Sequence, residues 1–189
     1  MTTTMTRPDL SPLARDLATD LDGAFTAYVL ATADGIFSGS LRMLGDRRDA
    51  EDVMQETYSR AYKALGGYSE ERIRNLKVGG WTWTIAANLC RNRLRSRARK
   101  PTVPLEALEV KATNTDTEDA ALSGIGKVLR RALMDLPFPQ RAAVVLRHVL
   151  DLTYDDIAAA LDRPVGTVKA DVHRGLTRLR RAYPEETIR

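Results

Sequence analysis

Cysteine, histidine and long apolar runs are scarce in this chain, and each scarcity narrows what it can be. A single cysteine, Cys90, excludes an internal disulfide. The two histidines, His148 and His173, are far apart in sequence, and Cys90 has no Cys-x-x-Cys partner, which argues against a metal or Cys-His site. No apolar run has the length of a membrane span, and the N-terminal residues lack the apolar core of a signal peptide. We therefore expect a cytoplasmic protein with no metal, no cofactor and no membrane insertion.

Charge is distributed unevenly along the 189 residues, although the net charge is only +4. The segment 91–100 holds six basic residues and no acid, whereas 102–121 holds five acids against Lys111 alone. Blocks of opposite sign indicate different partners for different segments. With 43% hydrophobic residues the chain can also bury a core, so it is not a disordered chain.

Helical periodicity dominates the sequence, which shows no strand pattern, internal repeat or heptad run. Apolar residues recur at helical spacing over 21–44, 48–65 and 81–98, and residues 68–80 between the last two helices read as a long polar loop. Further helices are expected around 122–136 and 140–149. The fold class is therefore all-α, with two small helical domains on a flexible acidic linker. The predicted parts are a polar N-terminal extension (1–20) in which a short helix can follow Pro12, a first domain (21–100), the linker (101–118) and a second domain (119–189).

The segment 152–181 has the layout of a helix-turn-helix. Thr153 and Asp156 form a capping box, which predicts a helix starting at Tyr154. Pro164 ends that helix and suits the first turn of the next one. In the second helix the apolar residues form one stripe, at Val165, Val168, Val172, Leu176 and Leu179.

The opposite side of this second helix carries donors suited to reading bases in the DNA major groove. The candidate DNA-binding residues are Thr167, Lys169, Ala170, His173, Arg174 and Thr177, with Arg178 beside them. A solvated basic face would show the same periodicity, but the capping box and the proline turn favour the DNA-binding interpretation. A helix-turn-helix alone does not choose a class of regulator.

Four segments occur in order at fitting separations: LRMLGD (41–46), DAEDVMQETYSRAYKAL (49–65), WTWTIAANLCRNRLR (81–95) and PVGTVKADVHRGLTRLR (164–180). Together they resemble the extracytoplasmic-function group of bacterial sigma-70 factors over about residues 21–181. The resemblance implies a region-2 helical bundle followed by a region-4 helix-turn-helix. It also implies a non-enzymatic factor that directs core RNA polymerase to promoters with −35 and −10 elements and assists DNA melting.

The resemblance assigns roles to particular positions. Asp52, Gln55 and Glu56 match the residues that dock on the β′ clamp of core RNA polymerase, and the β subunit is a further expected contact. The helix over 81–98 and the loop before it match the part that opens the −10 element, where unpaired bases need stacking surfaces and a cationic groove. The candidate −10 residues are Tyr68, Trp83, Thr84, Asn88, Arg91 and Arg95, whereas Trp81 is expected to pack in the core.

Three positions depart from the family pattern. Asn92 stands where the family often has Asp, and the loop 66–80 is longer than in many members. Asp171 replaces an arginine that is frequent in the recognition helix. An acid there either removes a phosphate contact or accepts a hydrogen bond from a cytosine amine.

Two other classes of protein fit the sequence less well. A free-standing helix-turn-helix regulator of the LuxR type would need a receiver domain with alternating strands and helices, and residues 1–100 show none. A nucleic-acid enzyme is disfavoured because the carboxylates read as helix caps, helix-surface charges and linker. The resemblance also implies an anti-sigma factor as partner, and Cys90 alone cannot form an intramolecular redox switch.

Overall fold

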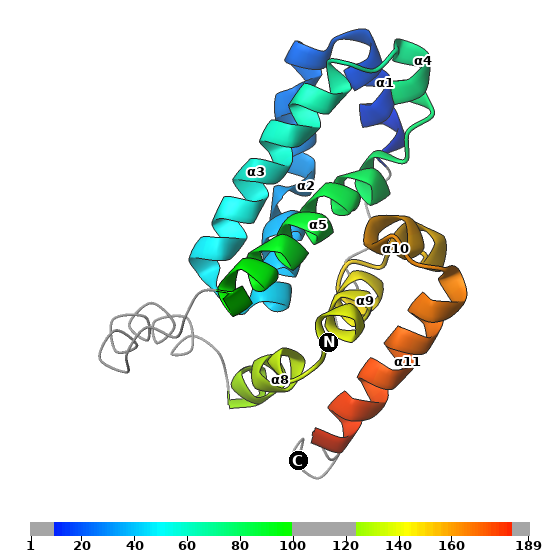
Figure 1. Cartoon of the computed structure of the whole chain (residues 1–189). Coiled ribbons are helices and arrows are strands. Elements are labelled where there is room, and N and C mark those ends of the chain that lie inside the picture. Colours follow the sequence, from blue (N-terminus) through cyan, green and yellow to red (C-terminus); the bar gives the residue numbers. More distant parts are fainter. Residues whose placement is uncertain (1–9, 100–123, 183–189) are drawn as a thin grey trace.

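The computed structural model describes residues 10–99 and 124–182, and every regular element in these ranges is a helix (Figure 1). The all-α fold class is confirmed. The predicted linker (101–118) lies outside the described residues. The helices are α1 (Ser11–Thr19), α2 (Leu21–Leu44), α3 (Arg47–Leu65), α4 (Glu70–Arg74), α5 (Val78–Arg99), α8 (Gly124–Met134), α9 (Phe138–His148), α10 (Tyr154–Leu161) and α11 (Val165–Ala182).

The first domain is built on α2, α3 and α5, which pack on one another through their apolar faces. The ends of α2 and α3 follow from local chemistry. Gly45 takes a left-handed conformation (φ 71°), and its amide donates to the Leu41 carbonyl at 2.8 Å, which closes α2. The Asp46 carboxylate then accepts from the Asp49 amide at 2.9 Å and starts α3. The predicted break at Gly45-Asp46 is thus confirmed.

Two short helices complete the first domain. The short helix expected after Pro12 is α1, and it buries Ala14, Leu17 and Ala18 against the bundle, which a loose polar extension would not do. The segment 68–80 was placed in a loop, but it contains α4, whose Ser69 hydroxyl accepts from the Arg72 amide at 3.3 Å. Helix α5 also begins before Trp81, at Val78. The part of the N-terminal segment that the structure describes therefore belongs to the first domain.

The second domain consists of α8 to α11 and contains the predicted helix-turn-helix. The Thr153 hydroxyl accepts from the Asp156 amide at 3.1 Å, so α10 begins at Tyr154 as expected. Asp162, with φ 53°, turns the chain towards α11. The apolar stripe of α11 faces α9 and α10, with Val168 and Val172 buried. Gly175 allows the close approach to α9, because a Cβ there would lie 2.6 Å from a methyl group of Val144.

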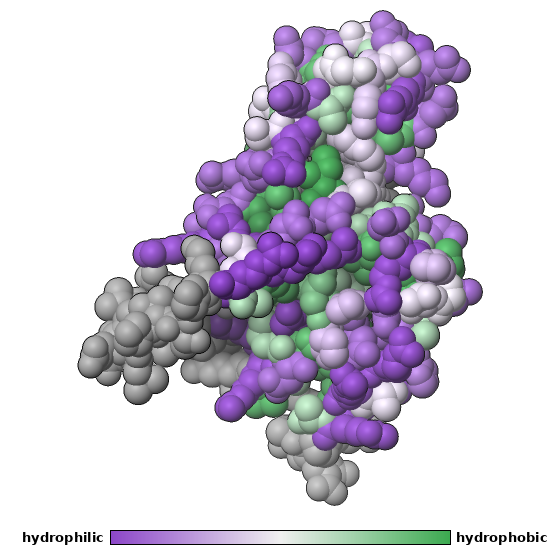
Figure 2. Space-filling model, in the orientation of Figure 1, coloured by the Kyte–Doolittle hydropathy of each residue, from purple (hydrophilic) through white to green (hydrophobic). Residues whose placement is uncertain are grey.

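The two domains pack against each other. Helix α5 lies along α10, and α2 contacts α8 and α9 (Figure 1). Gly39 of α2 marks one meeting point, because a Cβ there would lie 2.5 Å from the Trp83 ring and 2.8 Å from a methyl group of Leu150. One hydrophobic cluster therefore runs through both domains. Figure 2 shows hydrophobic side chains reaching the surface mainly around the middle of the face in view, between largely hydrophilic ends.

Candidate functional site

Helix α3 presents the three expected polymerase-binding residues, Asp52, Gln55 and Glu56, on its exposed side. The other side of the helix is anchored by buried residues such as Val53 and Ala61, which fixes how the polar side chains face solvent. A shallow groove runs beside them. It is lined by Asp52, Gln55, Glu56, Ser59, Arg60, Leu89 and Arg93. The structure thus brings the three residues together on one accessible surface.

The acids of this surface have basic neighbours. Asp52 accepts from Arg93 at 3.0 Å, and Glu56 accepts from Arg60 at 2.7 Å. All four side chains are 38–57% exposed, so each pair contributes only about 0–1 kcal/mol. Such weak pairs are easily exchanged for contacts with another protein.

Part of the basic segment 91–100 is engaged within the domain. Arg93 also reaches Asp49 at 3.6 Å, and Arg97 pairs with Asp46 at 3.0 Å and with Asp49. Partial burial opposes ionisation of Asp46, but the backbone amide of Asp49 and the charge of Arg97 prevail and lower its pKa. These arginines tie α5 to the start of α3, while Arg95 remains exposed.

Four of the expected −10 residues follow one side of α5. Thr84, Asn88 and Arg91 are half-buried, and Arg95 is exposed. The Arg91 guanidinium donates to the Asn88 side-chain oxygen and to the Leu161 carbonyl, both at 2.9 Å. Since Leu161 ends α10, this side of α5 is partly covered by the helix-turn-helix.

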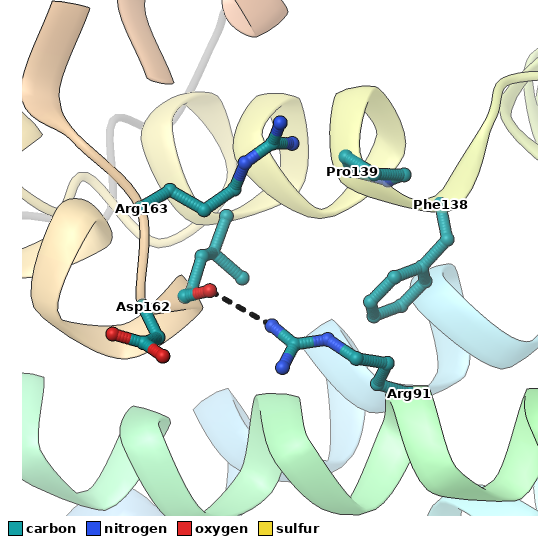
Figure 3. A pocket seen from close by; sticks show the side chains of 6 residues that line it. Arg91, Phe138, Pro139, Asp162 and Arg163 are labelled. Atoms are coloured by element: carbon teal, nitrogen blue, oxygen red, sulfur yellow. Dashed lines mark hydrogen bonds between the residues drawn. The ribbon is translucent and has the colours of Figure 1, made fainter. Parts of the chain in front are cut away.

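Figure 3 shows this contact at a cavity of about 290 Å³ between the domains. Arg91 rises from α5 towards the Leu161 carbonyl, with Phe138 on one side and Asp162 on the other. The cavity belongs to the interface between the domains, where Lys77 also lies 3.7 Å from the Asp156 carboxylate.

The two tryptophans of α5 exchange their expected places. Trp83 was expected to face DNA, but only 5% of it is exposed and its ring lies against Gly39. Glycine at that position lets α2 and α5 approach closely, and the indole fills the space. Trp81 was expected in the core, but it is only half-buried and meets the Tyr68 ring edge-on at a centroid distance of 6.0 Å.

Arg72 was not among the candidate residues, and the structure adds it to this aromatic pair. Its guanidinium carbon lies 3.6 Å from the centre of the Tyr68 ring. Tyr68, Arg72 and Trp81 therefore form one cluster of stacking and cationic groups, the kind of surface that unpaired bases use. The sequence signal was Ser69, a residue type favoured at helix starts, followed by two glutamates, but the five-residue α4 is too short to predict from periodicity.

The outward side of α11 carries the expected −35 residues. Lys169, His173 and Arg174 are exposed. The others, Thr167, Ala170 and Thr177, are half-buried, and the Thr177 hydroxyl donates to the His173 carbonyl at 2.9 Å. Tyr154 of α10 borders this side, with the Lys169 ammonium 5.6 Å from its ring centre. The structure therefore brings all six residues onto one helix and adds an aromatic neighbour.

Asp171 does not belong to that outward side. It is 3% exposed and paired with Arg163 and Arg174, so its carboxylate is not free to accept a hydrogen bond from a cytosine amine. The residue turns inward because it lies next to Val172 and one turn beyond Val168 on the buried stripe.

The described residues give little support for a metal site, a membrane-spanning helix or a reactive thiol. Within 10–99 and 124–182 no group of three or more potential ligands could hold a metal ion. No helix in those ranges is long and apolar enough to cross a membrane. Burial raises the pKa of the Cys90 thiol to about 11, so it is a protonated, inert side chain at neutral pH.

Comparisons with known proteins agree with this arrangement of surfaces. Residues 28–100 match sigma-70 region 2, and residues 127–179 match sigma-70 region 4. The chain is 33% identical over 171 residues to the ECF RNA polymerase sigma factor SigW of Bacillus subtilis, covering 84% of this chain and 88% of that protein. It is 31% identical over 163 residues to the RNA polymerase sigma-H factor of Pseudomonas aeruginosa, covering 80% and 81% respectively.

Two solved structures share the fold. One is the sigma factor RpoE in complex with the anti-sigma factor NepR from Bartonella quintana, with a TM-score of 0.63, 22% identity, and coverage of 84% of this chain and 95% of that chain. The other is CnrH in complex with the cytosolic domain of CnrY, with a TM-score of 0.63, 19% identity, and coverage of 89% and 93%. At these identities the likeness concerns the fold.

Proposed function

Because this chain belongs to the sigma-70 family of RNA polymerase sigma factors, in its extracytoplasmic-function group, we propose that its two domains divide promoter recognition between them. The first domain binds core RNA polymerase and the −10 element, and the second reads the −35 element. The observation that carries this proposal is the coincidence of regions 2 and 4 with the two helical domains, in order along the chain.

The polymerase contact is proposed for Asp52, Gln55 and Glu56 of α3. Their exposure, the groove beside them and the weakness of their internal ion pairs support this role. Two carboxylates that can exchange their weak internal pairs for contacts with a partner provide charged groups for recognition, and charge complementarity speeds the encounter of two proteins.

The −10 contact is proposed for Thr84, Asn88, Arg91 and Arg95, together with the cluster of Tyr68, Arg72 and Trp81. The arginines supply positive charge for the phosphates of an opened strand, and the aromatic rings supply stacking surfaces. Trp83 has a structural role instead, since its ring is buried between α2 and α5.

The −35 contact is proposed for the outward side of α11. Lys169, His173 and Arg174 project from a helix whose other side is locked into the domain, as a helix in the major groove requires. Thr167, Ala170 and Thr177 add small side chains that let the helix approach the bases.

We further propose a cytoplasmic location and regulation by an anti-sigma partner. Core RNA polymerase and promoter DNA are found there, and group membership supports such a partner. Since the Cys90 thiol is buried and protonated, a redox signal would act on the partner and not on this chain.

Run-off transcription with core enzyme tests the proposed function. Adding the chain should produce promoter-dependent transcripts from a library of genomic promoters. Replacing Asp52, Gln55 and Glu56 with Ala should abolish them by removing core binding, while Glu70→Ala on the exposed part of α4 serves as a control for lost charge. Binding of the chain to DNA without any stimulation of core enzyme would instead indicate a free-standing regulator.

A further inference from the structure

Asp171 is an acid buried in the helix that carries the proposed −35 contacts. Only 5% of its side chain is exposed, and each carboxylate oxygen has its own cationic partner. One oxygen accepts from Arg163, in the turn before α11, at 2.6 Å. The other accepts from Arg174, one turn further along α11, at 2.9 Å.

The three side chains form an ion-paired cluster around the buried carboxylate. A buried carboxylate without a partner is costly, whereas two charge-assisted hydrogen bonds stabilise its charged form. Together the one acid and the two arginines carry a net charge of +1. Without the acid the same surface would carry +2, and both guanidinium groups would move freely.

The two arginines differ in exposure. The Arg163 side chain is 33% exposed, whereas that of Arg174 is 55% exposed. Asp171 therefore restrains one edge of the Arg174 guanidinium while leaving much of that side chain open to solvent on the outward side of α11. A fixed guanidinium loses less conformational entropy on binding a base than a freely rotating one.

We propose that Asp171 is a positioning residue for −35 recognition: it orients Arg174 towards the bases and withdraws Arg163 from non-specific contact with phosphates. The proposal rests on the proposed function, because it needs α11 to read DNA. Asp171 itself does not touch DNA, since it is buried beneath its two partners.

Replacing Asp171 with Asn keeps the shape and removes the charge. Sequence discrimination and non-specific affinity should then change in opposite directions. Two released arginines strengthen binding to any DNA and steepen its salt dependence by about one unit of slope per added phosphate contact. A freely moving Arg174 discriminates less between bases, and a good arginine–base contact corresponds to about tenfold in affinity.

The experiment compares holoenzymes reconstituted from core RNA polymerase and the full chain on a promoter library randomised at the −35 element. Transcript yields give the discrimination between the best and the scrambled sequence, and filter binding at several KCl concentrations gives the non-specific affinity. For Asp171→Asn we expect discrimination to fall about tenfold while non-specific binding rises. In an Arg174→Ala background, Asp171→Asn should cause no further loss of discrimination.

Asp155→Asn is the matched control, because Asp155 is an exposed acid on α10 of the same domain. It removes one negative charge and should leave discrimination unchanged. Equal loss of transcription from best and scrambled promoters by Asp171→Asn would indicate a purely structural role and would overturn the proposal. So would unchanged discrimination.

Arg163→Met covers the case in which Asp171→Asn fails to fold. It leaves the whole carboxylate to Arg174, so discrimination should be kept, and non-specific affinity should change little because Arg163 is already withdrawn from the phosphates. A loss of discrimination as large as that of Arg174→Ala would contradict the proposal. Absence of any promoter-dependent transcript with the unaltered chain would contradict the proposed function instead.

Discussion

Trp81 and Trp83 are two positions apart on α5, and the structure gives them opposite surroundings. The sequence could show that both lie near the start of a helix, but not which side of its first turns faces α2. That choice depends on Gly39, which is distant in sequence and leaves room for only one indole ring. The role of Asp171 could likewise not be predicted, because its partner Arg163 lies in the turn before α11 and contacts it across the first turns of the helix.

The close packing around the single residue Gly39 gives a testable prediction. A methyl group there would lie 2.5 Å from the Trp83 ring and 2.8 Å from Leu150, and neither group can move aside without disturbing the core. Gly39→Ala should therefore destabilise the protein by about 1–3 kcal/mol, measured as the free energy of unfolding in urea.

Gly166 is the matched control, because it also lies in a helix but has nothing within 4 Å of where its Cβ would be. Gly166→Ala should be neutral or stabilising by up to about 1 kcal/mol through helix propensity alone. Equal effects of the two substitutions would contradict the close packing at Gly39.

Among the features of single helices, their ends were the most predictable, because residues close in sequence determine them. Thr153, Gly45 and Pro164 set boundaries through neighbouring backbone groups, and the structure confirms those boundaries. Helix α4 differs from the loop expected at 68–80 because it has only five residues, and its stability comes from packing against α1. Propensity alone does not reveal such helices.

Asp46 allows a prediction about the α3–α5 pair. Its carboxylate both caps α3 and pairs with Arg97. Asp46→Asn keeps the cap and loses the ion pair, whereas Asp46→Ala loses both and should be less stable by about a further 1 kcal/mol. Urea unfolding of the three proteins at several pH values measures these differences.

The contribution of Asp46 to stability changes with pH in a defined direction. The pKa of Asp46 is lowered in the folded state, so its charge stabilises the fold above the pKa of the unfolded chain, about 3.9, and this contribution is lost as the pH falls through the folded value. The difference in the free energy of unfolding between the original protein and Asp46→Asn should therefore be largest at pH 7 and shrink below about pH 4. A difference that is independent of pH would argue against the ion pair.

The arrangement of the two domains in the whole molecule is the main difference from the sequence-based expectation. Two helical domains were predicted, and family membership supports them, but their packing against each other was not. The interface joins Arg91 to the Leu161 carbonyl, Arg130 to the Gly45 carbonyl and Lys77 to Asp156. No local pattern encodes contacts between residues so far apart in sequence.

This packing conflicts with simultaneous reading of two promoter elements. Helix α10 lies on the side of α5 that carries Asn88 and Arg91, so a DNA strand cannot reach that side while the domains touch. The interface combines these polar contacts with the apolar contact of Gly39, Trp83 and Leu150, and relative motion of the domains is the usual expectation for interfaces within one chain. We therefore expect the domains to part when the chain joins core polymerase at a promoter.

A disulfide across the interface tests the central claim that initiation requires α5 and α10 to separate. A Cβ at Gly80 would lie 3.3 Å from the Cβ of Asp156, close to the roughly 3.5–4.5 Å that a disulfide spans. The chain with Gly80→Cys and Asp156→Cys should form this bond on oxidation, whereas each single variant should not.

The decisive measurement is run-off transcription by core RNA polymerase with this double variant, oxidised and reduced, beside the two single variants. The account predicts promoter-dependent transcripts from the reduced double variant and from both single variants in either state. It predicts little or no transcript from the oxidised double variant, with activity restored by reduction. Equal transcription from its oxidised and reduced forms would contradict the account.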